Sequence, residues 1–214
     1  MNKLVLDIET IKDDSMVPFI PEKKPSDKKE PWEKVQFDSN YNKICCISLF
    51  DGTFEKKDET KDVIIELPVA KHFGLSEFDF DEKKLLDAFW MYVVNVEKFI
   101  TFNGLEFDIP YLYKRSLLQR SQPSVWISLK KYYVENHIDV RAILGNWSTS
   151  ASGNLDLYCK IMLGKSCKNN MDGSEVQKYW NEKRYEEIYK YCDNDCIYLW
   201  EIYQKMMGYY SGIF

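Results

Sequence analysis

The sequence predicts an α/β fold, in which helices pack on a sheet, and three observations support this prediction. Strand-like patterns are concentrated in the first part of the chain, and helical spacing of apolar residues dominates the second part. A buried-looking strand at 98–103 follows the first long helix, so a crossover connects it to the earlier strands. A length of 214 residues fits one medium domain, and we expect a single domain over 1–214.

The elements follow in order from local patterns. Expected strands cover residues 3–10, 42–50, 63–69 and 98–103, with Asp51-Gly52 as a hairpin-type turn after the second. Expected helices cover residues 80–96, 108–120, 154–163 and 183–207. Pro110 is tolerated in the first turn of its helix. Ser174 and Gln177 have the spacing of a capping box before the last helix.

The segment at about 11–42 is a long loop with prolines and lysine pairs, and it also contains Phe19 and Trp32. A loop of this length in a compact domain is either functional or mobile. Because it begins directly after the first strand, it could close over a substrate channel as a lid. A surface loop without that role is the alternative, and the sequence leaves both open.

Composition excludes several classes of protein. The net charge of −5 and pI near 5.3 argue against binding nucleic acid mainly through a basic surface. Hydrophobic residues make up 45%, enough for a core, while no apolar run reaches the length of a membrane span. The six cysteines form no CxxC pair, so we expect reduced thiols in the core. We find no signal-peptide pattern and expect a cytoplasmic protein.

Two acidic residues stand inside the hydrophobic first strand. With a period of two, Asp7 and Glu9 share a face with Val5, and they lie about 6–7 Å apart. Such a pair is costly in apolar surroundings unless a cation neutralises it. An edge strand with a solvated acidic face is the alternative, and the short D-x-E string does not decide between them.

A third acidic residue, Asp108, follows the strand at 98–103 and the turn at Gly104. It could be the N-cap of the next helix, a role that Asp often fills. Alternatively, the strand end presents Asn103 and Asp108 toward a site beside the first strand. The local sequence does not separate these two interpretations.

The last helix places a fourth acidic residue in an apolar seam. Positions that alternate by four and three predict a buried stripe, which contains Ile188, Cys192, Asp195, Leu199, Ile202 and Met206. A carboxylate there is costly unless it is paired or binds a metal. Tyr191 lies one turn before Asp195 on the same face. Pairing with an Arg or a helix cap is the alternative, although no basic residue lies one turn away on the stripe.

Four carboxylates with no His or Cys nearby suit Mg²⁺ or Mn²⁺ rather than zinc. Two such ions can clamp the attacking and leaving oxygens of a phosphodiester.

Three motifs resemble a known family. D-I-E-T at 7–10, N-G-x-x-F-D-x-P at 103–110 and Y-x-x-x-D at 191–195 are similar to the exonuclease motifs of the DnaQ-like, or DEDD, 3′→5′ exonucleases. The run at 171–176 resembles the stand-alone group related to the exonuclease domain of B-family DNA polymerases. The resemblance spans almost the whole chain. It implies a ribonuclease H-like fold, a mixed five-stranded sheet with helices on both faces.

The branch of the family follows from residues near the last acid. One branch has His five residues before it, where this chain has Lys190, and the other has Tyr four residues before it, where this chain has Tyr191. The chain therefore resembles the tyrosine branch (DEDDy).

The resemblance also implies roles for single residues. Asp7 would bridge two divalent ions, Mg²⁺ or Mn²⁺, and Glu9 with Asp195 would complete the site of the ion that activates water. Asp108 would hold the second ion, and Tyr191 would orient the attacking water. In addition, three residues would contact the 3′-terminal nucleotide or shape its site, namely Thr10, Asn103 and Phe107.

The function expected from this resemblance is metal-dependent 3′→5′ exonuclease activity that releases nucleoside 5′-monophosphates from single-stranded 3′ ends. DNA is favoured over RNA as the substrate. The alternatives are an exoribonuclease of the same chemistry and a non-catalytic nucleic-acid-binding module that retains the fold. The sequence specifies no polymerase or repair partner.

Further residues have weaker patterns. Candidate phosphate contacts on or near the helix at 108–120 are Lys114, Arg115, Arg120, Lys130 and Lys131, although charge runs are usually solvated faces. His137 precedes a helix start that Asp139 could cap, and we expect a structural or supporting role for it.

Overall fold

The computed structural model of the protein describes residues 3–24, 26, 28–52, 70–150, 152–168 and 171–210. Its strands are β1 (Lys3–Lys12), β2 (Asn42–Phe50), β3 (Lys71–Gly74), β4 (Lys98–Thr101) and β5 (His137–Asp139). Its α-helices are α1 (Pro31–Val35), α2 (Glu82–Tyr92), α3 (Asp108–Gln119), α4 (Val140–Leu144), α5 (Leu155–Tyr158), α6 (Val176–Asn181) and α7 (Tyr185–Tyr210). Four short helical turns are η1 (Asp14–Phe19), η2 (Leu75–Phe78), η3 (Cys159–Leu163) and η4 (Gly173–Glu175).

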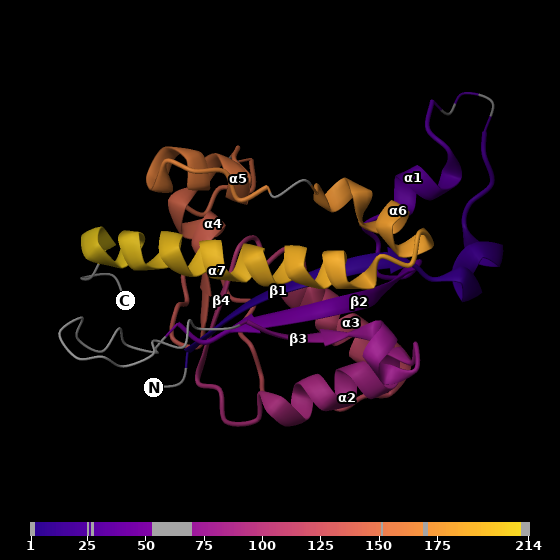
Figure 1. The fold of residues 1–214 in the computed structure, drawn as a ribbon, viewed down its shortest axis with the longest axis horizontal. Coiled ribbons are helices and arrows are strands. Elements are labelled where there is room, and N and C mark those ends of the chain that lie inside the picture. The colour runs from indigo at the N-terminus through magenta and orange to yellow at the C-terminus, as the bar shows by residue number, and fades with distance from the viewer. Residues whose placement is uncertain are drawn as a thin grey trace.

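The strands form one mixed sheet in the order β3-β2-β1-β4-β5 (Figure 1). The pairs β1–β2 and β2–β3 are antiparallel, while β1–β4 and β4–β5 are parallel. This arrangement confirms the predicted α/β fold with a mixed five-stranded sheet. It also excludes the edge-strand alternative for the D-x-E pair, because β1 lies at the centre of the sheet.

Helices cover the two faces of the sheet, with α7 crossing one face and α2 and α3 lying on the other (Figure 1). The alternation along β1 matches these layers. Leu4, Leu6 and Ile8 belong to the buried cluster that contains the core residues of α2 and α3. Val5 belongs to the cluster formed with the C-terminal half of α7. Since Asp7 and Glu9 have the parity of Val5, they point toward the face that α7 covers.

The seam predicted on α7 is confirmed. Its five apolar members are buried: Ile188, Cys192, Leu199, Ile202 and Met206. All six cysteines are also buried free thiols, as expected. No helix among the described residues has the length and apolar character needed to cross a membrane.

One local expectation concerns residues outside the described part of the chain, and others were incomplete or wrong. The strand expected at 63–69 lies outside the described residues, and β3 follows it at Lys71–Gly74. The segment expected to be a loop at 11–42 contains the end of β1 as well as η1 and α1. The capping box before the last helices is formed by Asp172 and Glu175, each two positions before the corresponding member of the expected pair. The Gln177 side chain instead accepts a hydrogen bond from the backbone N–H of Lys12 at 2.7 Å.

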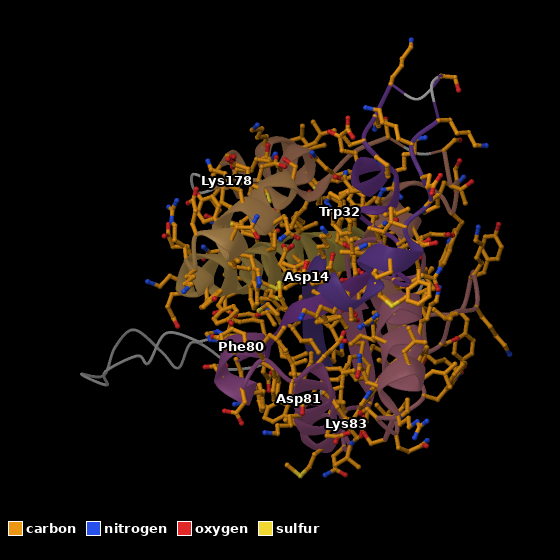
Figure 2. All side chains as sticks on the ribbon, turned by 90° about the vertical axis from the view of Figure 1, so that its right-hand side faces the viewer. Asp14, Trp32, Phe80, Asp81, Lys83 and Lys178 are labelled. Atoms are coloured by element: carbon orange, nitrogen blue, oxygen red, sulfur yellow. The ribbon has the colours of Figure 1, made fainter. Side chains whose placement is uncertain are left out.

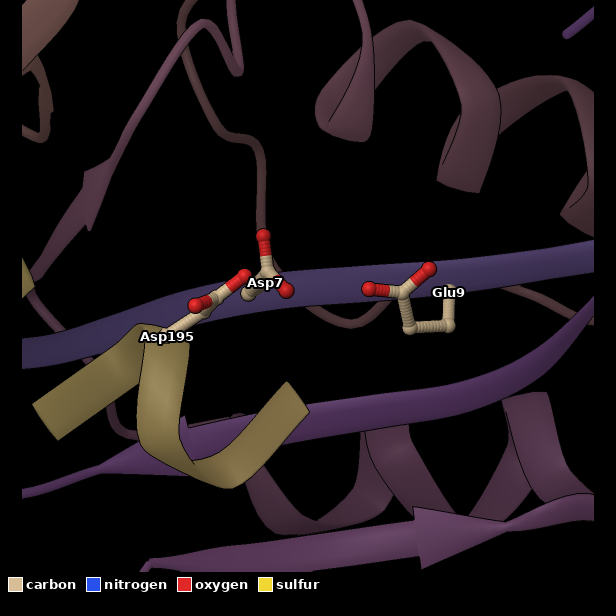
Figure 3. Close-up of side chains that lie close together, drawn as sticks. All are labelled: Asp7, Glu9 and Asp195. Carbon is tan, nitrogen blue, oxygen red and sulfur yellow. The ribbon is translucent and has the colours of Figure 1, made fainter. Parts of the chain in front are cut away.

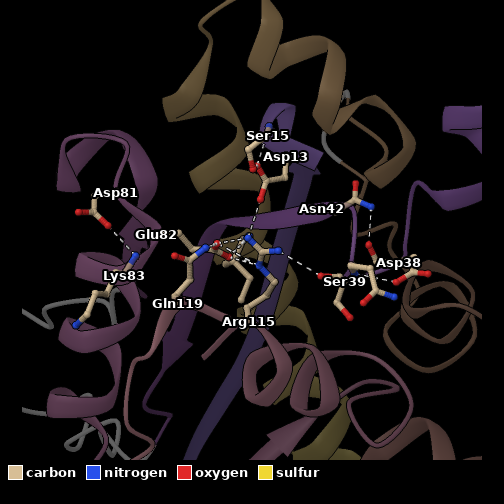
Figure 4. Close-up of polar contacts among 12 residues, drawn as sticks. Asp13, Ser15, Asp38, Ser39, Asn42, Asp81, Glu82, Lys83, Arg115 and Gln119 are labelled. Carbon is tan, nitrogen blue, oxygen red and sulfur yellow. Dashed lines mark hydrogen bonds and ion pairs between the residues drawn. The ribbon is translucent and has the colours of Figure 1, made fainter. Parts of the chain in front are cut away.

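A buried arginine ties the segment after β1 to the helices below the sheet (Figure 4). Arg115 on α3 is 2% exposed, and its guanidinium donates to Glu82 at 2.5–3.1 Å and to Asp13 at 2.9 Å. It also donates to the carbonyl of Ser39 at 3.3 Å, while Glu82 accepts from the backbone N–H of Ile44 at 2.8 Å. One cation therefore fixes both ends of the 11–42 segment.

This network corrects the expectation that Arg115 contacts phosphate, because its donors are used inside the protein. Two other candidates also lie near carboxylates. Lys114 is 3.9 Å from Asp38, and Lys131 is 3.8 Å from Glu106.

We predict that Arg115→Ala lowers the free energy of unfolding by about 3–5 kcal/mol, because it leaves two buried carboxylates without their cation. Urea denaturation measures this loss. Lys114→Ala is the matched control on the same helix, and its partly exposed pair predicts a change within about 0.5 kcal/mol. A loss below about 1 kcal/mol for Arg115→Ala would contradict the structural role of the network.

Candidate metal centre

Three carboxylates from β1 and α7 converge above the central strand (Figure 3). Asp7, Glu9 and Asp195 each offer a carboxylate oxygen, and these three oxygens all lie within 4.8 Å of one another. The two segments are far apart in the sequence, and the packing of α7 across the sheet brings them together (Figure 1). The first and third predicted motifs therefore meet at one site.

The local structure of β1 makes room for the fourth carboxylate. The pairing of β1 with β4 covers only residues 3–5 of β1. After Val5, the backbone groups of β1 that face β4 therefore need other hydrogen-bond partners. The N–H of Ile8 donates to Asp108 Oδ1 at 3.2 Å. Asp108 is the first residue of α3, and the N-cap position belongs to Phe107, so the N-cap interpretation of Asp108 was wrong. The carboxylate of Asp108 instead lies against β1, although it is outside the group of three.

The pairing of β1 with β2 is irregular at the same point. The register shifts between Glu9 and Thr10, and Cys45 of β2 has no partner in the ladder. Bulges of this kind re-aim side chains and are frequent beside active sites.

The rotation of α7 about its axis is fixed by residues that flank Asp195. Cys192 Sγ lies 3.4 Å from Asp7 Oδ2, and Cys196 Sγ lies 3.4 Å from the carbonyl of Ser48. Asp193 accepts a hydrogen bond from Ser48 Oγ at 2.5 Å and contacts His72 Nδ1 at 2.9 Å. Since Asp193 and Asp195 are about 200° apart around the helix, anchoring one toward β2 and β3 turns the other toward β1.

The electrostatics of the centre suit a cation. Burial, together with the three neighbouring carboxylates, raises the pKa of Asp7 well above its usual range. Burial and the charges of Asp195 and Asp108 raise the pKa of Glu9 in the same way. Burial raises the pKa of Asp108 and of Asp195 to about 7 each. Negative charge is therefore unfavourable here without a positive partner.

Asp195 supplies the most direct test of whether the residues fit a metal ion. Its Oδ1 is buried and has no hydrogen-bond partner among the described residues. The alternative that an Arg or a helix cap satisfies Asp195 therefore finds no support in the described part of the chain. A buried carboxylate oxygen without a donor, beside two other carboxylates, matches the hard oxygen ligands of Mg²⁺ and Mn²⁺.

Tyr191 lies one turn before Asp195 and is partly buried. Burial and the carboxylates of Asp195, Glu9 and Asp7 raise the pKa of its phenol. The phenol therefore keeps its proton at neutral pH and can donate a hydrogen bond. A methyl group on Gly173 would lie 3.8 Å from the Tyr191 hydroxyl, so the 171–176 run borders this side of the centre.

The three residues expected to contact the terminal nucleotide have different surroundings. Thr10 borders a shallow pocket next to Glu9, together with Phe37 and Gly173. Phe107 makes an edge-to-face contact with Phe37, with ring centroids 6.3 Å apart. Asn103 has φ of 70°, and its side chain accepts a hydrogen bond from Arg141 at 2.7 Å, so its oxygen is engaged within the protein.

Two supporting residues were anticipated only in part. Asp139 caps α4, as expected, and also accepts from the backbone N–H groups of Asn103 and Leu105 at 2.9 Å each. His137 is buried between Thr101 and the carbonyl of Ser128, at 2.8 and 2.7 Å, which is a structural role. Asp193 was missed, because nothing in the sequence pairs it with Ser48 and His72 across more than 100 residues.

The fold and this acidic cluster define an α/β enzyme of the ribonuclease H-like class. The chain belongs to the family described as predicted 3′-5′ exonucleases related to the exonuclease domain of PolB, whose model matches residues 37–213. The matched range contains the second and third motifs and begins after the D-x-E strand. A search of curated proteins found no match.

We predict that the metal-free protein loses stability as pH rises from about 4 to 8 and that Mg²⁺ restores it. The folded state holds protons that the unfolded carboxylates release near pH 4, so the free energy of unfolding falls with pH above that value. Protons compete with the cation, so the gain from Mg²⁺ should be larger at pH 8 than at pH 6. Thermal unfolding with EDTA or Mg²⁺ measures both effects.

Two neighbouring substitutions sharpen this test. Asp195→Asn should raise the metal-free Tm at pH 8 by at least about 2–4 °C, or ~1 kcal/mol for a chain of this size, and reduce the stabilisation by Mg²⁺. Asp193→Asn is the matched control, and it should lower the Tm because it weakens the contacts with Ser48 and His72. A drop in Tm for Asp195→Asn would show that the negative charge of Asp195 does not destabilise the metal-free protein.

Proposed function

We propose that this exonuclease removes nucleotides one at a time from single-stranded DNA 3′ ends by a two-metal-ion mechanism and releases nucleoside 5′-monophosphates. The observation that carries the proposal is the convergence of Asp7, Glu9 and Asp195, with an unpartnered Asp195 oxygen. The relation of the family to a polymerase exonuclease domain favours DNA over RNA. The membership in a tyrosine branch rests on Tyr191, one turn before Asp195.

The carboxylates would hold two divalent cations, Mg²⁺ or Mn²⁺. Asp7, Glu9 and Asp195 would hold one of them, and Asp7 with Asp108 would hold the other. When bound, the two ions supply a water of lowered pKa and stabilise charge on the attacking and leaving oxygens.

The remaining roles belong to the chain itself. Water attacks the terminal phosphorus, the bond from phosphorus to the 3′ oxygen of the preceding nucleotide breaks, and that oxygen leaves as a hydroxyl. The Tyr191 hydroxyl, which keeps its proton, is suited to orient the attacking water rather than to act as a base. Thr10 follows Glu9 and lines a small pocket with Phe37, whose ring contacts Phe107, the residue before Asp108. The terminal nucleotide would lie near these residues. Asn103 would act by shaping the strand end, because its side chain is held by Arg141.

The test is hydrolysis of 5′-labelled single-stranded DNA and RNA with Mg²⁺, Mn²⁺ or EDTA. We expect a ladder that shortens from the 3′ end, no products with EDTA, and faster hydrolysis of DNA. Asp7→Ala should lower kcat by at least about 10²–10³-fold, as expected for removal of a preorganised electrostatic group. Glu106→Ala, which removes an exposed carboxylate two residues before Asp108, should leave kcat unchanged. Tight binding with intact substrate under every metal would falsify the proposal.

A separate prediction concerns Tyr191. Tyr191→Phe should lower kcat by roughly 10–10²-fold with little change in KM, because the attacking water loses its hydrogen-bond partner. The pH profile of kcat should keep its shape, since a phenol with a raised pKa does not titrate near neutrality. If the variant loses one limb of the profile, Tyr191 acts as a base and the positioning role is wrong.

A further inference from the structure

A pocket of about 520 Å³ lies beyond the metal centre, where β1 ends. Its volume is within the ~300–1,000 Å³ range of small-ligand sites. Five segments contribute to it: the end of β1, η1, α1, the start of β2 and the region that joins α6 to α7. Figure 2 shows Trp32 beside Asp14 on this side of the molecule, away from α2. We call it the distal pocket.

Lysines and aromatic rings line the distal pocket. Its principal lining residues are Lys12, Lys43, Lys183, Trp32, Trp180 and Tyr185. Asp14 is the one acidic residue among those that line it, so the wall carries a net positive charge although the chain carries −5. None of the three lysines forms an ion pair with a described residue, in contrast to Lys114 and Lys131. These ammonium groups are therefore open to an anionic ligand.

The aromatic residues are held in place. The ammonium of Lys12 lies 5.5 Å from the centre of the Trp32 ring, and the rings of Trp180 and Tyr185 are 4.6 Å apart. The backbone of Lys12 is fixed by Gln177 on α6, and the ends of the segment that carries Trp32 are fixed by Arg115. Positive charge beside fixed aromatic rings is the combination that binds single-stranded nucleic acid.

A second, smaller pocket adjoins the distal pocket and includes Thr10, the residue after Glu9. This smaller pocket shares Trp32 and Gln177 with the distal pocket and is also lined by Thr10 and Gly173. Thr10 follows Glu9, and Gly173 borders Tyr191. Lys12 lies three positions after Glu9 along the strand, a distance of ~10 Å. The two adjoining pockets and the strand from Glu9 to Lys12 therefore outline the course that a bound substrate strand would follow.

We propose that the distal pocket is a second nucleic-acid subsite, which binds a nucleotide of the substrate strand 5′ to the scissile bond. Its lysines contact backbone phosphate and Trp32 stacks on a base. The proposal rests on the exonuclease function given above and adds how the substrate strand is held. In this proposal the 11–42 segment contacts the substrate strand, as the lid interpretation expected, but Lys12 and Trp32 do so from fixed positions in the wall of the distal pocket.

Hydrolysis as a function of substrate length tests the subsite. Oligothymidylates from a dinucleotide up to roughly a dozen nucleotides span the range that short single-strand sites bind. In the unmodified protein, kcat/KM should rise with length until the distal pocket is reached. Trp32→Ala should lower kcat/KM for the long substrates about tenfold, the low end of the loss for one stacked base, and lower it much less for the dinucleotide. The variant Lys43→Glu with Lys183→Glu should act in the same way.

The matched control is Lys83→Glu with Lys84→Glu on α2, which makes the same charge change on exposed residues away from Trp32 (Figure 2). It should leave the length dependence intact. If Trp32→Ala and the Lys43/Lys183 double variant both keep the full dependence on length, the distal pocket is not a subsite. The distal pocket is also not a subsite if these variants lower kcat/KM for the dinucleotide by the same factor as for the long substrates.

Binding without turnover separates this inference from the proposed function. Fluorescence anisotropy with EDTA measures the affinity for a labelled long oligothymidylate. For the Lys43/Lys183 double variant, the slope of log K against log salt should shrink by about 1.4, or ~0.7 for each lost phosphate contact. If the unmodified protein hydrolyses no substrate, the proposed function fails, and this assay still decides the pocket. An unchanged slope overturns the subsite.

Discussion

The structure depends on holding four carboxylates together in a place where their charges repel. Asp7 and Glu9 lie on the central strand of the sheet, and burial raises the pKa of both. Such an arrangement is unfavourable for the fold alone. It persists because the surrounding elements are fixed by other contacts, and it would offer a cation ligands that the fold already brings together. The proposed metal binding would thus gain affinity at the position where the repulsion between carboxylates lowers stability.

The contacts that impose this arrangement come from all layers of the fold. The pairing of β4 with β1 ends at Val5, so the N–H of Ile8 donates to Asp108 instead. Asp193 anchors α7 on β2 and β3, and this anchoring turns Asp195 toward β1. The buried guanidinium of Arg115 fixes the segment after β1 through its contact with Asp13. These contacts pair polar groups within the protein, whereas Oδ1 of Asp195 is buried and has no hydrogen-bond partner among the described residues.

The overall charge of the chain is a poor guide to its substrate. A net charge of −5 argues against a broad basic surface, and the structure agrees, because Arg115 is buried and Lys114 and Lys131 lie near carboxylates. Positive charge is local instead. It is contributed by the cations that the carboxylates would hold and by the lysines of the distal pocket. Thr10, which follows Glu9, and Trp32, which lines the distal pocket, also line one smaller pocket together.

The sequence by itself determined the order of most elements, the seam of α7 and the acidic positions, because period-two and period-3.6 patterns are local properties of the chain. It left open whether Asp108 caps a helix and whether the D-x-E strand is an edge strand. Only the tertiary structure decided these points, since each depends on a partner distant in sequence: Ile8 for Asp108, and β4 for β1. The burial of Arg115 and the assembly of the distal pocket have the same origin. Both are made by segments that meet only in the folded chain, so no local pattern could reveal them.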